Sequence, residues 1–193
     1  MKRAKTRGDS RARLVETTAQ LLRVQGYHAT GLNQIVEESE APKGSLYHYF
    51  PQGKEELAAE ALGLASQATL ARLRDLFSNH RLKDALALLV EQAIADLEAS
   101  DYQHGCPIAT VALETVSCDC LQTQCANFFR QAISLLEEAM KREGVPPDKV
   151  PGLAQMSFAA YEGAVLLSRV LKSPAPLRQV AAQIKLHMKL ALS

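Results

Sequence analysis

Six residues between positions 43 and 54 are suited to contact with a polyanion. They are Lys43, Gly44, Ser45, Tyr47, His48 and Lys54. An ammonium group can reach a phosphate or a guanine edge, and hydroxyl and imidazole groups can form hydrogen bonds at short range. Gly44 lets the backbone approach DNA closely. Lys54 begins the next helix, where its charge and the free N–H groups can both face a phosphate. This pattern predicts a DNA-binding segment.

The aromatic residues of the same segment have a second interpretation, in which they close a small hydrophobic core. We favour that interpretation for Tyr49 and Phe50. For Tyr47 and His48 we favour contact with DNA, because polar aromatic residues on a short exposed helix need a partner.

These residues need a short helix and two supporting helices to position them. Apolar residues recur at three- and four-residue spacing over 10–25 and Gly26 follows, which predicts a helix that ends there. Gly31 is placed to cap a second helix, and Pro42 suits the first turn of a third, which ends before Pro51. The last two helices are joined by a tight turn, so the segment predicts a helix-turn-helix motif.

Helical periodicity dominates the rest of the 193 residues, and no convincing strand pattern occurs. A long fourth helix starts after Gly53 and continues through Phe77. Further helices are predicted over 82–99, 108–116, 121–142, 150–172 and 177–192, between breaks marked by Gly, Pro and Ser. We therefore expect an all-α protein of about nine helices, with a helix-turn-helix domain over 1–54 and a helical effector-binding and dimerisation domain over 55–193.

The formal net charge of +1 conceals an asymmetry. Residues 1–54 carry nine basic and five acidic residues, whereas the remainder carries 13 basic and 16 acidic residues. A basic head on a mildly acidic body favours contact of one end with a polyanion. The alternative is a basic tail that is simply solvated.

Several classes of protein are disfavoured by the sequence. No apolar run approaches the roughly 20 residues that span a bilayer, and the basic N-terminus does not precede the apolar run of a secretory signal. We therefore expect a cytoplasmic protein with reduced cysteines. No phosphate-binding loop, nucleophile elbow, zinc-protease motif or closed zinc pattern occurs, so we expect neither an enzyme nor a metal site, and no cofactor.

The segment 11–57 resembles the DNA-binding signature of TetR-family regulators. The resemblance is carried by Gly26-Tyr27, Thr30, Ile35, the run from Lys43 to Phe50, and Lys54-Glu55-Glu56-Leu57. It implies that the third helix enters the major groove, that Thr30 and Gly31 also contact DNA, and that a homodimer reads a palindrome. The sequence departs from the family at Gly31, where Ser or Thr is usual, at Glu40, where a turn glycine is usual, and at Pro42, where Ser is usual.

Further similarity extends into the body. Gly105-Cys106-Pro107, Glu114 and Tyr161-Glu162-Gly163-Ala164 are similar to the LmrA/YxaF-like branch of the family. Such a body is expected to bind a small effector, and the candidate ligand-binding residues are Cys106, Glu114, Phe128, Tyr161 and Glu162. The carboxylates of Glu114 and Glu162 suit a cationic or hydroxylated ligand. Alternatively, they form internal pairs, for instance with Arg130 or Arg169.

The last two helices carry regular apolar stripes that could belong to the core of one chain. The resemblance instead implies a four-helix dimer interface, and small residues there permit close helix approach. The residues expected at that interface are Met156, Ala160, Gly163, Ala164, Leu167, Leu177, Ala181, Ile184 and Met188.

The sequence thus predicts a dimeric, ligand-responsive transcriptional repressor that binds a palindromic operator and is released by a small effector. One alternative is a thiol- or metal-sensing regulator that uses Cys118, Cys120 and Cys125 on the same scaffold. Another is a helical binding protein or enzyme without a DNA-binding function.

Overall fold

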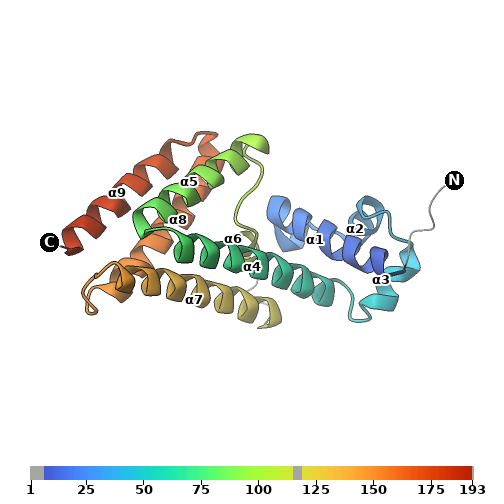
Figure 1. Ribbon diagram of the computed structural model, residues 1–193. Coiled ribbons are helices and arrows are strands. Elements are labelled where there is room, and N and C mark those ends of the chain that lie inside the picture. Colours follow the sequence, from blue (N-terminus) through green and yellow to red (C-terminus); the bar gives the residue numbers. More distant parts are fainter. Residues whose placement is uncertain (1–6, 115–118, 193) are drawn as a thin grey trace. The chain divides into compact units, whose positions relative to one another are not determined.

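The computed structural model describes residues 7–114 and 119–192 (Figure 1). Within these ranges the chain forms nine α-helices and no strand, which confirms the predicted all-α class. The helices are α1 (Arg7–Ala29), α2 (Leu32–Glu38), α3 (Lys43–Tyr49), α4 (Lys54–Asn79), α5 (Leu82–Ala99), α6 (Pro107–Ala112), α7 (Asp119–Arg142), α8 (Val150–Leu171) and α9 (Ala175–Leu192).

The chain packs as two compact units. Unit 1 contains the chain up to Gln67 together with Pro107–Ala126, and unit 2 contains Ala68–Cys106 together with the chain from Asn127 onward. Helices α4 and α7 therefore contribute residues to both units. The boundary predicted after Lys54 falls inside unit 1, at the first residue of α4.

Unit 1 is built around α1, which packs against α2, α3 and α6. The helices meet through fully buried aliphatic and aromatic side chains, among them Leu14, Leu22, Ile35, Leu46, Phe50 and Leu57. Burial of each such side chain stabilises the fold by roughly 1.5–3 kcal/mol. The short helices α2 and α3 hold their place through this packing, because seven-residue helices are not stable alone.

Glycine and proline mark the helix ends in unit 1 much as the sequence predicts. Gly26 has a φ of 80° and interrupts α1, so the regular helix ends where it was expected to end. Gly31 is the N-cap of α2. Pro42 is the N-cap of α3 and does not lie within its first turn. Glu40 has a φ of 51°, which explains why a glycine is usual at this position in the family that the sequence resembles.

The predicted limits of α6 and α9 differ from those in the structure. Helix α6 ends at Ala112, whereas the sequence predicts a helix as far as residue 116; positions 115 and 116 lie outside the described residues. Helix α9 begins at Ala175, two residues earlier than predicted, because Pro176 fits the first turn of a helix.

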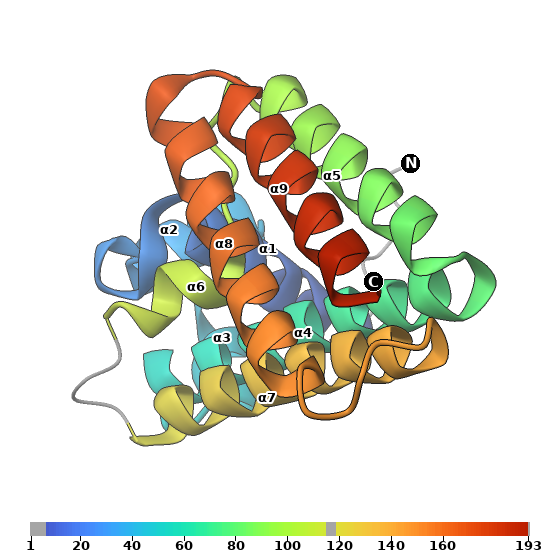
Figure 2. The ribbon, with the colours of Figure 1, turned by 90° about the vertical axis from the view of Figure 1, so that its left-hand side faces the viewer.

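In unit 2, α9 lies along α5 and α8 (Figure 2). These helices enclose a core of Val90, Ile94, Leu97, Ala164, Val165 and Leu177. The partly buried side chains of Tyr102, Tyr161 and Ala181 pack against this core. Among the described residues, no helix is both long enough and apolar enough to cross a bilayer.

Candidate nucleic-acid interface and effector site

Helix α3 is anchored on one side and exposed on the other. Leu46 and the residue that follows the helix, Phe50, are fully buried, which confirms the core interpretation of Phe50. Tyr47 is 65% exposed, and Lys43 and His48 are exposed as well. Exposing a tyrosine costs hydrophobic stabilisation, so its outward position on a seven-residue helix suits a binding surface.

The remaining residues of α3 keep this surface accessible. No atom lies within 4 Å of the position that a β-carbon at Gly44 would occupy, so another molecule can approach the backbone there. Ser45 is half-buried, and its backbone N–H donates to the carbonyl of Pro42. Tyr49 is half-buried, with its ring 4.9 Å from that of His48.

Thr30 and Gly31 lie at the start of α2, and their environments differ. Thr30 is 1% exposed, and its hydroxyl donates a 2.6 Å hydrogen bond to the carbonyl of Gly26. The Thr30 hydroxyl therefore stabilises the start of α2. The predicted contact of Thr30 with DNA stays a prediction. Gly31 is exposed with open space around it. The free N–H groups of the first turn of α2 follow it.

Lys54, the first residue of α4, is held by neighbours in unit 1. Its Nζ lies 4.4 Å from the centre of the Tyr27 ring and donates to the carbonyl of His28 at 3.3 Å. Burial lowers the pKa of Lys54, and the charge of Glu114 acts in the opposite direction. Its predicted contact with phosphate therefore has to coexist with these internal contacts.

The five predicted ligand-binding residues are divided between the two units. Glu114 lies in unit 1, where its carboxylate accepts a 2.6 Å hydrogen bond from the backbone N–H of His28. Cys106, Phe128, Tyr161 and Glu162 all lie in unit 2. Phe128 is buried, and its ring packs edge-on against that of Phe129 at 5.6 Å.

Glu162 is a buried carboxyl group with an unmet hydrogen-bonding demand. The thiol of Cys106 hydrogen-bonds to it, whereas its Oε2 has no partner among the described residues. Burial raises the pKa of Glu162 to about 7, although the bond with Cys106 acts in the opposite direction. Burial also raises the pKa of the neighbouring Tyr161, and the charges of Glu162 and Cys106 add to that effect.

Two further polar atoms on α8 share this condition. The hydroxyls of Ser157 and Ser168 are buried and find no hydrogen-bond partner among the described residues. Buried polar groups in native proteins are nearly always hydrogen-bonded. Ser157, Glu162 and Ser168 are five and six residues apart along α8, so each of these side chains has an unmet hydrogen-bonding demand of its own.

The cysteines of the thiol- or metal-sensing alternative have different environments. Cys125 is buried, and that burial raises its pKa to about 11, which disfavours the reactive thiolate. Cys120 is exposed, and Cys118 lies outside the described residues. Within the described part of the chain, no group of three or more His, Cys, Asp or Glu is placed to hold a metal ion.

Burial separates the predicted dimer residues into two sets. Ala164, Leu177, Ile184 and Met188 are buried within their own chain, and Ala181 packs against the unit 2 core. These residues have little surface exposed on the single chain, and their place at a dimer interface stays a prediction. The members that keep surface are Met156, Ala160, Gly163 and Leu167.

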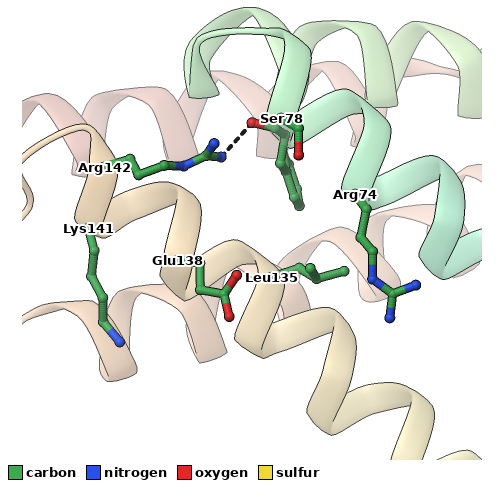
Figure 3. A pocket seen from close by; sticks show the side chains of 7 residues that line it. Arg74, Ser78, Leu135, Glu138, Lys141 and Arg142 are labelled. Atoms are coloured by element: carbon green, nitrogen blue, oxygen red, sulfur yellow. Dashed lines mark hydrogen bonds between the residues drawn. The ribbon is translucent and has the colours of Figure 1, made fainter.

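A surface pocket of about 360 Å³ lies between the C-terminal parts of α4 and α7 (Figure 3). It is lined by Arg74, Phe77, Ser78, Leu135, Glu138, Lys141 and Arg142. Arg142 donates to the carbonyl of Phe77, one of the last carbonyls of α4. Cations near the end of a helix stabilise its unpaired carbonyls, so the basic lining has a structural cause.

An anchored short helix with an exposed polar face, preceded by a second short helix and a tight turn, defines a helix-turn-helix protein. A TetR-family N-terminal family model matches residues 14–61, and a model of the C-terminal domain of LmrA/YxaF-like transcriptional regulators matches residues 83–183. The chain belongs to the TetR family of transcriptional regulators and to its LmrA/YxaF-like branch. This is a family of regulators and not of enzymes.

Relatives match nearly the whole chain. The sequence is 36% identical to the uncharacterized HTH-type transcriptional regulator YxaF of Bacillus subtilis, covering 93% of this chain and 95% of YxaF. It is 30% identical to the HTH-type transcriptional regulator LmrA of the same organism, covering 92% and 95%. The reduced form of NemR from Escherichia coli superposes with a TM-score of 0.78 at 25% identity, covering 91% of this chain and 95% of NemR.

Proposed function

We propose that this regulator is a homodimeric repressor that binds a palindromic operator through α3 and leaves it when a small effector binds in unit 2. The observation that carries the proposal is the exposure of Lys43, Tyr47 and His48 on a helix anchored by buried neighbours. Such a helix suits the major groove, where side chains read base edges. Because a repressor binds its operator on chromosomal DNA, we propose that the protein is cytoplasmic.

A dimer is supported by the exposed side of α8. Along this helix, Met156, Leu167 and Val170 recur at helical spacing with exposed side chains, and Val170 is 71% exposed. The intervening Ala160 and Gly163 are small enough for a second helix to approach closely. Helix α9 adds the exposed side chains of Leu186 and Leu190. An apolar surface of this kind marks an interaction site, and a two-fold dimer would present two copies of α3 to two half-sites.

Effector binding is supported by the orphaned polar atoms of α8. A ligand with a cationic or hydroxyl group would satisfy Glu162 Oε2, while its apolar part would contact the surrounding aromatic and aliphatic side chains. Cys106 and Tyr161 lie beside Glu162, which supports an effector site that includes these three residues. Release from DNA then requires the effector to bind more tightly to the conformation that does not fit the operator.

The DNA-binding role of α3 is tested with Tyr47→Ala and Lys43→Ala, measured on a duplex that the wild-type protein selects from a random pool. We expect each substitution to weaken binding to this duplex by about tenfold or more, since a base contact contributes roughly 1–3 kcal/mol. Lys83→Ala, which removes the same charge from an exposed site on α5, is the matched control and should bind as the wild type does. Undiminished binding by both α3 variants would show that this helix does not read DNA.

A further inference from the structure

We call residues 26–31, from the interruption of α1 at Gly26 to the N-cap of α2, the α1–α2 link. This link receives a carboxylate from the turn that follows α6. The backbone N–H of His28 donates to Glu114 Oε2 at 2.6 Å, across 86 positions of sequence. Both residues belong to unit 1, in which α1 and α6 are packed against each other. A charge-assisted hydrogen bond of this length is among the stronger contacts in a protein.

Gly26 provides the space that this carboxylate occupies. A β-carbon at Gly26 would overlap Glu114 Oε1, and the φ of 80° is one that residues with side chains rarely adopt. The glycine is therefore required both by its own backbone conformation and by the close approach of Glu114. The carbonyl of Gly26 also accepts a hydrogen bond from the hydroxyl of Thr30, just before α2 begins.

Lys54, at the C-terminal end of the helix-turn-helix, also contacts this link. Lys54, which follows the turn after α3, donates to the carbonyl of His28 and lies over the ring of Tyr27. The peptide units around His28 thus bond to the end of α6 through Glu114 and to α4 through Lys54. Both bonds hold the chain at His28, just before α2, and Lys54 ties that point to the start of α4. They therefore add to the core packing that positions α2 and α3 within unit 1.

We infer that Glu114 is a positioning residue for operator recognition, whose carboxylate holds the α1–α2 link against the end of α6 and thereby fixes the helix-turn-helix for binding. This inference rests on the proposed DNA-binding function. Glu114 itself needs no contact with DNA, since it acts through the backbone of His28. The sequence predicts it on a helix of the body and gives no sign of this role.

The change in affinity for DNA on removal of the Glu114 carboxylate has opposite signs for a positioning role and for a purely electrostatic effect. Removal of an acidic group from a DNA-binding unit strengthens binding through phosphate electrostatics. Loss of a positioning contact weakens binding to the selected duplex and leaves binding to random duplex nearly unchanged. Glu16→Ala is the matched control, because it removes the same charge from an exposed site on α1.

The experiment measures affinity for the duplex selected by the wild-type protein and for random duplex, at one salt concentration. We expect Glu114→Ala to weaken specific binding by about tenfold, the equivalent of one charge-assisted hydrogen bond. Glu114→Gln, which keeps an acceptor without the charge, should lie between Glu114→Ala and the wild type. Glu16→Ala should bind as tightly as the wild type or more tightly.

Amide NMR of His28 supplies a readout that does not depend on DNA. We expect the His28 amide proton to move upfield and to exchange faster with solvent in Glu114→Gln, which also decides the matter if Glu114→Ala fails to fold. The inference would be overturned if folded Glu114→Ala or Glu114→Gln bound the selected duplex as tightly as the wild type or more tightly, with the same preference over random duplex. If the wild-type protein selects no duplex, the proposed function itself is wrong.

Discussion

The buried carboxyl group of Glu162 makes the stability of this protein depend on pH. Its pKa is raised from an ordinary value of 4.5 to about 7 in the folded chain, chiefly by burial. A group with a raised folded pKa gives stability that is fully present below pH 4.5 and is lost as the pH rises through 7. The replacement Glu162→Gln removes this proton equilibrium while it keeps the size of the side chain.

The magnitude follows from the separation of the pKa values in the unfolded and the folded chain. A tenfold change in a proton-binding constant corresponds to about 1.4 kcal/mol, so the interval from 4.5 to about 7 corresponds to about 3 kcal/mol in the free energy of unfolding. We therefore expect the wild-type protein to lose about 3 kcal/mol relative to Glu162→Gln between pH 4.5 and pH 8. Effects of the substitution that do not vary with pH cancel in this comparison.

Urea denaturation at fixed protein concentration, followed by circular dichroism at several pH values, measures this difference. Glu138→Gln on α7, which changes an exposed carboxylate, is the control and should follow the wild-type curve. A difference between Glu162→Gln and the wild type that stays constant from pH 4.5 to pH 8 would refute the claim that Glu162 is buried without adequate partners.

Two further substitutions test the dimer surface of α8 and the hydrogen bond of Thr30. Val170→Glu places a charge on the exposed stripe of α8 and should convert dimers to monomers in sedimentation velocity. Leu88→Glu, at an exposed position on α5, is the control and should remain dimeric. An unchanged dimer in Val170→Glu would place the interface elsewhere. Thr30→Val removes the buried hydrogen bond from the Thr30 hydroxyl to the Gly26 carbonyl, and it should lower the free energy of unfolding by about 1–2 kcal/mol in urea denaturation. An unaltered midpoint would contradict the structural role of Thr30.

Local signals in the sequence predict much of unit 1 because each one acts within a few residues. Gly26 ends the regular part of α1, Gly31 caps α2, and the burial of Phe50 follows from its place beside a short helix. The proximity of Gly26 and Glu114 was missed, since it depends on the packing of α6 against α1. A glycine at a helix end is sufficiently explained by the helix end itself, so nothing local points to the carboxylate.

The last two helices show what a local pattern leaves open. An apolar stripe with helical spacing shows that one side of a helix is buried, but not whether its own chain or a partner covers it. The stripe through Leu177, Ile184 and Met188 is covered by its own chain. On α8 the two sides are occupied differently, with Ala164 inward and Leu167 outward.

Operator recognition by a dimer is measured by selection from a pool of random duplexes with the purified protein, at moderate salt, followed by sequencing of the retained DNA. We expect enrichment of an inverted repeat with two half-sites, bound by two chains as counted by native mass spectrometry, and loss of that enrichment in Tyr47→Ala. A retained pool as random as the starting pool, or an enriched sequence that Tyr47→Ala selects equally well, would contradict it.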